Sequence, residues 1–206
     1  MSAATLPLTP EQLTVRRPVW EALSELYLDT DTRPGLPALA RTLAVSELSA
    51  DDLRTIWQDE VTPLLHSNLL SVAGVWAGFD QDWLETRIVA RRTRLGDRLG
   101  DRWPPLTRLI QRWHNELDPS FQTALTLRGE LLALPESHRS GRVAAWTWLA
   151  RAYFWPESPV LGPAPHTSEL ETLFTALEPQ LRPLLTGKES AGQARDSVLK
   201  LLHMDR

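Results

Sequence analysis

Two short stretches of the chain carry residue types that enzymes use, and neither has the surroundings its chemistry requires. Leu28-Asp29-Thr30-Asp31-Thr32 superficially resembles the Asp-x-Asp-x-Thr loop of a class of phosphatases in which the first aspartate attacks phosphorus. Such a loop follows a parallel strand and needs a downstream lysine, whereas the residues before Asp29 repeat at helical spacing and the next lysine is Lys188. His114-Asn115-Glu116 has the His-x-Glu spacing of zinc deaminases, but the chain has no cysteine to complete that site. We interpret the first stretch as a turn at a helix end and the second as surface.

The remaining residue patterns predict no metal centre and no cofactor. The five histidines never stand at His-x-x-x-His spacing, so a metal-binding pair on one helix face is not expected. The sequence contains no Gly-x-Ser-x-Gly nucleophile elbow, no phosphate-binding loop with lysine and no dinucleotide fingerprint. No catalytic residue can therefore be named, and an enzyme acting through unassigned carboxylates is kept only as an alternative.

Composition points to an all-helical protein. The chain has 206 residues, a formal net charge of -4, and 37 leucines against 10 valines and 3 isoleucines. Leucine favours helices, whereas valine and isoleucine are the residues that fill strands. We predict an all-α fold of about eight helices in a compact bundle-like array, with no significant sheet. Because the sequence has neither a signal-peptide pattern nor an apolar run of roughly 18 residues, we also expect a soluble, cytoplasmic protein with no membrane contact.

Hydrophobic spacing and capping residues set the expected helix boundaries. Helices are predicted from beyond residue 14 to about 28, over 36–45, from 50 to about 65, over 81–102, 105–117 and 119–134, and then over 143–155, 168–177 and 190–203. Pro18 is expected in the first turn of its helix, and Pro63 is expected to kink or end its own. Ser49 with Asp52, and Ser168 with Glu171, form capping-box patterns, and Asp80 is a further N-cap. Pro119 should restart a helix, and Pro179 and Pro183 should break one.

These elements suggest four regions along the chain. We expect a flexible tail over 1–12, an N-terminal helical domain over 13–103, a C-terminal helical region over 104–186 packed on it, and a helix or tail over 187–206. Charge is uneven between the thirds: residues 1–82 carry -7, residues 83–155 carry +5 and residues 156–206 carry -2. The acidic first third and the basic middle could pair internally, or either could face a charged partner.

Arginines recur along one side of the helix predicted over 81–102. At 100° per residue, five of them fall within an arc of about 80°: Arg87, Arg91, Arg94, Arg98 and Arg102. One interpretation is an anion-binding ridge for nucleic acid phosphates or an acidic protein, and the other is a solvated or internally neutralised face. Arg92 falls instead on the apolar side of this helix, so it should be buried against a carboxylate or carbonyl partner.

Aromatic residues form two dense groups. Trp76, Phe79 and Trp83 lie beside glycine and alanine and could form a ligand cleft or an interface, although a packed core is the more common outcome. The second group comprises Trp146, Trp148, Tyr153, Phe154 and Trp155, and its nearly all-apolar helix predicts burial on every side.

Three segments resemble a bacterial helical domain of unknown function. They are Val15 to Thr30 (VRRPVWEALSELYLDT), Ile56 to Pro63, and Asn68 to Asp80 (NLLSVAGVWAGFD) with Trp83. The resemblance covers about residues 13–90 and implies no activity, cofactor or partner. It marks Arg16, Arg17, Trp20, Asp29, Glu60, Asn68, Trp76, Asp80 and Trp83.

The marked residues look mainly architectural: Trp20, Trp76 and Trp83, together with Trp57, are expected to anchor a small core. Arg16 and Arg17 are the exception, because positive charge near a helix N-terminus is unfavourable. We therefore expect them to pair with Asp29, Glu60 or a partner's acid.

The sequence as a whole favours a non-enzymatic protein that binds another macromolecule, most plausibly a protein, in an immunity-like or regulatory role. The candidate binding residues are Arg16, Arg17, Trp76, Phe79, Trp83 and the five arginines of the stripe. Binding of nucleic acid or another polyanion through that stripe is the main alternative.

Overall fold

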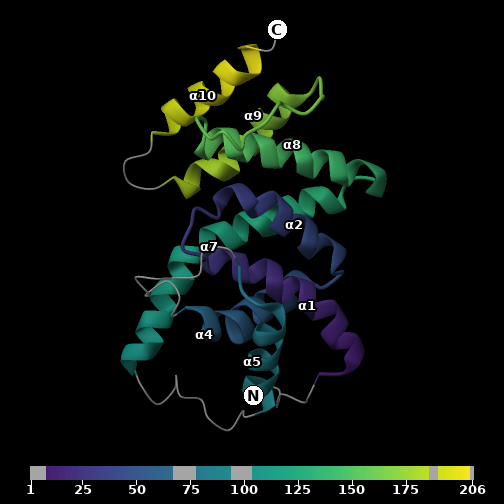
Figure 1. Ribbon diagram of the computed structural model, residues 1–206, viewed down its shortest axis with the longest axis vertical. Coiled ribbons are helices and arrows are strands. Elements are labelled where there is room, and N and C mark those ends of the chain that lie inside the picture. Colours follow the sequence, from purple (N-terminus) through teal and green to yellow (C-terminus); the bar gives the residue numbers. More distant parts are fainter. Residues whose placement is uncertain (1–7, 67–77, 94–103, 186–189, 205–206) are drawn as a thin grey trace. The chain divides into compact units, whose positions relative to one another are not determined.

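The computed structural model describes residues 8–66, 78–93, 104–185 and 190–204, and these ranges form helices and connecting turns without a strand (Figure 1). The predicted all-α class is therefore confirmed. The longer helices are α1 (Pro10–Ser24), α2 (Leu36–Val45), α5 (Gln81–Thr93), α7 (Pro104–Leu132), α8 (Glu136–Phe154), α9 (Leu170–Leu181) and α10 (Ala191–Met204). Shorter elements are α3 (Ala50–Thr55), the π-helix η3 (Ile56–Val61), α4 (Thr62–Leu65), and the 3₁₀ turns η1 (Glu25–Tyr27), η2 (Arg33–Gly35) and η5 (Arg182–Leu184).

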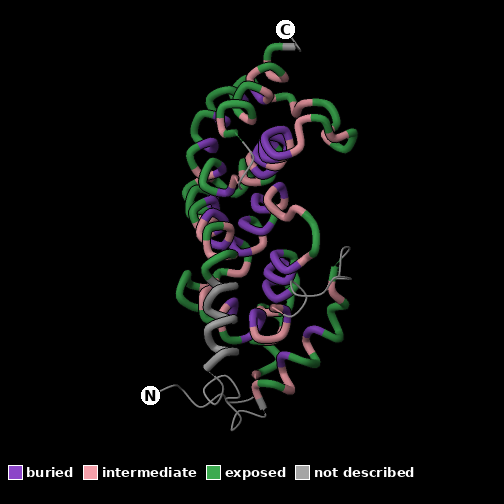
Figure 2. Tube along the Cα trace, turned by 90° about the vertical axis from the view of Figure 1, so that its left-hand side faces the viewer, coloured by how far each residue is buried: buried purple, intermediate pink, exposed green. Residues whose placement is uncertain are grey.

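The chain divides into two compact units that are not continuous in sequence. The first unit contains residues 1–31 and 45–118, and the second contains residues 32–44 and 119–206. The helix α7 begins in the first unit and ends in the second. Buried residues line the inner sides of the helices within each unit, and exposed residues follow the outer sides (Figure 2).

In the first unit, α1 and α5 pack against each other and both contact η3. Its most deeply buried large side chains include Trp20 and Trp57, with 1% and 0% of their surfaces exposed. Leu84 and Ile88 of α5 are buried with them. Two of the tryptophans expected to anchor a core in this part of the chain therefore do so.

α1 begins earlier than predicted. Thr9 is its N-cap, and its hydroxyl accepts a hydrogen bond from the Gln12 N–H while the Gln12 side chain accepts one from the Thr9 N–H. This reciprocal capping box, followed by a proline at the first helical position, starts the helix at Pro10. Pro18 consequently lies inside the helix, and the prediction that it occupies the first turn is wrong.

Just before Pro63, where the sequence predicts a kink or an end, the helix becomes a π-helix. The N–H and the hydroxyl of Thr62 both donate to the carbonyl of Trp57, five residues earlier, with an O–O distance of 2.7 Å for the hydroxyl. Proline has no N–H and its ring crowds the preceding turn, so a wider turn just before Pro63 lets the helix continue through α4. The chain therefore changes helix type at this point instead of ending.

Three other predicted boundaries are wrong. α7 runs through Pro119 as one helix, so Asp118 and Pro119 do not start a new one. α8 begins at Glu136, before the expected start near Val143. α9 is preceded by Glu169 without a side-chain cap and extends past Pro179 to Leu181. In α9, buried Leu177 and Leu181 lie on the two sides of Pro179, and in α7 the side chains of Phe121 and Ala124 are buried just after Pro119. This packing outweighs one lost hydrogen bond and keeps the helices intact.

In the second unit, α8 contacts η2, α9 and α10. Trp146, Trp148, Tyr153 and Phe154 are buried, as predicted for this aromatic group, and Trp155 is half-buried. Arg33 stacks on Phe154 with its Cζ 4.3 Å from the ring centroid. Arg128 Nε donates to the carbonyl of Leu43 at 3.1 Å, which attaches α2 to α7. Within the described ranges, no helix is both long and apolar enough to cross a membrane.

Candidate functional site

The helix α5 buries one side and exposes the other. Its first turn is capped by Asp80, whose carboxylate accepts a hydrogen bond from the Trp83 N–H at 2.7 Å, as the sequence predicts. Leu84 and Ile88 are 2% and 0% exposed, so they fix which side faces the core. Arg87 and Arg91 are on the solvent side.

Phe79, Trp83, Arg87 and Arg91 stand four residues apart, and we call this row the α5 ridge. Trp83 retains 42% of its surface and stacks on Phe79 with the ring centroids 6.4 Å apart and the planes 18° from parallel. The Cζ atom of Arg87 lies 5.8 Å from the centroid of the Trp83 ring, within cation–π range. Trp83 is thus an exposed, laterally supported aromatic, and the prediction that it anchors the core is wrong.

The arginine stripe is present in part. Arg87 and Arg91 are exposed, and no carboxylate of the described residues forms an ion pair with either. Arg94, Arg98 and Arg102, like Trp76, lie outside the described residues. The part of the stripe that the structure describes is therefore two arginines one helical turn apart, next to the exposed tryptophan.

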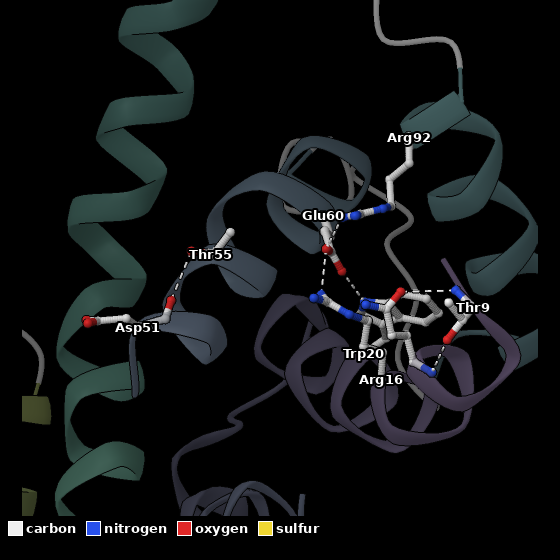
Figure 3. A network of polar contacts seen from close by, with 8 residues as sticks. Thr9, Arg16, Trp20, Asp51, Thr55, Glu60 and Arg92 are labelled. Atoms are coloured by element: carbon white, nitrogen blue, oxygen red, sulfur yellow. Dashed lines mark hydrogen bonds and ion pairs between the residues drawn. The ribbon is translucent and has the colours of Figure 1, made fainter. Parts of the chain in front are cut away.

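A buried charge cluster lies on the opposite side of α5. Glu60, 2% exposed and carried by η3, accepts hydrogen bonds from Arg16 Nη1 at 2.7 Å and Trp20 Nε1 at 2.6 Å, and forms an ion pair with Arg92 (Figure 3). We call these four residues the Glu60 cluster. Arg92, whose side chain is 18% exposed, has the carboxylate partner that the sequence predicts. The expected pairing of Arg16 with Glu60 is likewise confirmed.

The Glu60 cluster connects three elements. Arg16 and Trp20 lie on α1, Glu60 on η3 and Arg92 on α5. Removing one partner from a buried ion pair leaves a charge that is poorly solvated, so the cluster resists separation of these elements. Its geometry indicates a structural role: it holds α5 in the orientation that exposes the α5 ridge.

Arg17 is engaged at the surface. Its Nη2 donates to Glu85 Oε1 at 2.8 Å, and the hydrogen bond and charge of Glu85 raise the pKa of the Arg17 guanidinium. Because α1 begins at Pro10, Arg16 and Arg17 are not at a helix N-terminus, and the helix-dipole argument for their pairing is wrong. Both arginines join α1 to neighbouring elements within the first unit.

A second buried polar contact was not foreseen from the sequence. The hydroxyls of Tyr27 and Thr62 lie 2.6 Å apart, and burial raises the pKa of Tyr27 well above its ordinary value. The only signal in the sequence is that a threonine directly precedes Pro63, where the helix must accommodate a missing N–H.

Leu28 to Thr32 lie just after a helix end, as the sequence predicts. These residues follow η1 as irregular chain and turns, not the end of a strand. Among the described residues, no three histidine or acidic side chains gather closely enough to hold a metal ion. In the second unit, a groove of about 990 Å³ lies between residues 163–168, α9 and α10, and its walls are mostly proline and small hydroxyl side chains.

One comparison with known proteins gives a match. The model of a family described as a domain of unknown function, DUF7079, matches residues 14–120. The match includes the α5 ridge and the Glu60 cluster, and it extends further than the resemblance expected over residues 13–90. No curated protein and no solved structure matches the chain significantly.

Proposed function

The chain belongs to the DUF7079 family, whose description names no activity, and we propose from the site itself that it works by binding another protein through the α5 ridge. The observation that carries the proposal is Trp83: a 42% exposed indole held between Phe79 and Arg87. The proposal also includes what the sequence alone suggests, a bacterial, cytoplasmic, non-enzymatic role of an immunity-like or regulatory kind.

Tryptophan and arginine are the residue types most enriched at the energetic centres of protein interfaces. An exposed indole buries a large apolar area when a partner covers it, and stacking on Phe79 limits the side-chain entropy lost in doing so. The Glu60 cluster supports the same role, because a fixed helix presents its side chains at lower entropic cost than a mobile one.

Charge supports a protein partner over a polyanion. The first unit contains 17 acidic and 11 basic residues, a formal net charge of -6. Nucleic acid binding depends on many phosphate contacts with lysine and arginine, and an acidic unit opposes the approach of a polyanion. Arg87 and Arg91 provide positive charge over only a short stretch of the surface that the structure describes.

Trp83→Ala tests the proposal, with Leu132→Ala as the matched control. Trp83 and Leu132 are 42% and 41% exposed, but Leu132 belongs to the second unit. Tagged versions of the full chain would be used to capture partners from nuclease-treated lysate of its source organism. A protein that is retained by the parent chain and by Leu132→Ala, and lost from Trp83→Ala, is the expected result. Equal retention by both variants would contradict the proposal, and loss of all material on nuclease treatment would favour nucleic acid.

A further inference from the structure

We propose that the segment docking on the α5 ridge is an acidic helix of the partner, with two carboxylates one helical turn apart and an apolar side chain at one end. This inference rests on the proposed function and adds the chemistry of the partner. The carboxylates would face Arg87 and Arg91, and the apolar side chain would cover Trp83.

The arginines near the α5 ridge differ in whether they already have an acidic partner. Arg16 and Arg92 share Glu60, and Arg17 is paired with Glu85. Arg87 and Arg91 are exposed, and no acid among the described residues forms an ion pair with them. The positive charge that a partner meets on the described part of α5 is therefore confined to these two side chains.

The spacing of Arg87 and Arg91 along α5 matches that of side chains on a second helix. Residues four apart on a helix are separated by about 6 Å along its axis, so carboxylates at i and i+4 of a partner helix match Arg87 and Arg91 one to one. An extended peptide binds mainly by backbone hydrogen bonds to a strand edge, whereas the interior N–H and C=O groups of α5 are used within the helix. A ridge of side chains on a helix packs best against the groove of a second helix.

The α5 ridge changes from aromatic to basic along its length. The N-terminal end of α5 is aromatic and carries Asp82, whereas Arg87 and Arg91 follow toward the C-terminal end. Glu21 and Asp82 line a small pocket beside Trp20, together with Arg17 and Glu85, which are paired with each other, so the net charge of the pocket lining is negative. A uniformly acidic partner would be repelled there. The partner segment must be apolar opposite Trp83 and acidic only opposite the two arginines.

Photo-crosslinking tests the chemistry of the partner. A benzophenone amino acid at exposed Thr86, beside the ridge, would be compared with the same group at exposed Thr126 in the second unit. Both full-length proteins would be irradiated in nuclease-treated lysate, and the crosslinked peptide would be sequenced by mass spectrometry. We expect an adduct from position 86 alone, on a segment with two acidic residues three or four positions apart next to an apolar one. An adduct on a segment without such a pair would overturn the inference but keep the proposed function. Failure to form any protein adduct at position 86 would overturn both.

Charge reversal tests the pairing itself with the partner so identified. We expect Arg87→Glu with Arg91→Glu to weaken binding at least about tenfold, and replacement of the partner's two acids by lysine to restore it. The double reversal Arg41→Glu with Arg195→Glu is the control, because both of these arginines are exposed on the second unit. Unchanged melting of each variant would show that folding is intact. If the reversal at Arg87 and Arg91 leaves affinity unchanged while Trp83→Ala abolishes binding, the proposed function stands and the acidic partner helix does not.

Discussion

Glu60 and Arg92 lie 32 positions apart, on η3 and α5, and form an ion pair in which the carboxylate is 2% exposed and the guanidinium 18% exposed. The same carboxylate binds Arg16 and the indole of Trp20. One acid thus satisfies three donors from two helices. The cluster is internal, whereas the adjacent arginine, Arg91, is exposed. We therefore expect Arg92 to contribute to stability and Arg91 to contribute to binding.

Glu60→Gln should destabilise the protein by about 3 kcal/mol, toward the lower end of the range for breaking a buried ion pair because both arginines retain some solvent. Asp59→Asn is the matched control, since Asp59 is exposed on the same π-helix, and a surface change of this kind should cost less than about 0.5 kcal/mol. Urea unfolding followed by circular dichroism measures both. Similar midpoints for the two variants would show that Glu60 does not hold the first unit together.

Arg92→Ala should lower stability, whereas Arg91→Ala should weaken binding. Loss of Arg92 leaves Glu60 with one fewer positive partner and should lower stability by about 1–3 kcal/mol. Arg91→Ala should leave stability within about 0.5 kcal/mol and weaken capture of the partner. Melting temperatures and pull-downs on the same two proteins provide the comparison. A stability loss from Arg91→Ala as large as that from Arg92→Ala would contradict the assignment of the two roles.

The sequence was sufficient to predict that Arg92 has a polar partner, because helical periodicity places this arginine among apolar residues, where a charge must be paired. The cap at Asp80, the capping box at Ser49 and the bounds of α2 were predictable for the same reason: their signals are local. Composition together with periodicity also predicted the all-α class.

Helix boundaries predicted at prolines are wrong because local sequence rules do not include the stabilising effect of tertiary packing. Pro18, Pro119 and Pro179 all lie within helices, and each is closely followed by a buried side chain, namely Val19, Phe121 and Leu181. The burial predicted for Trp83 is wrong for a related reason. Aromatic composition predicts burial, but only the three-dimensional placement of Leu84 and Ile88 shows which side of α5 faces solvent.

The start of α1 can be tested at its cap. Thr9→Ala removes the hydroxyl that accepts from the Gln12 N–H and should cost about 1 kcal/mol. Thr9→Ser keeps that hydroxyl and should retain most of the stability. Chemical unfolding of the pair distinguishes a helix that begins at Pro10 from one that begins beyond residue 14, because in the second case neither change would matter.

Stability should fall above about pH 10 through Tyr27. Its phenol is buried against Thr62, and burial raises its pKa in the folded protein above the ordinary value of about 10. Above pH 10 the unfolded chain therefore loses the Tyr27 proton while the folded protein keeps it, so ionisation favours unfolding as pH rises. Tyr27→Phe removes this contribution: it should be less stable than the parent near pH 7 by about 1 kcal/mol, for the lost hydrogen bond, and lose less stability between pH 9 and 11. Urea unfolding across that range measures both slopes, and parallel slopes for the two proteins would contradict the raised pKa.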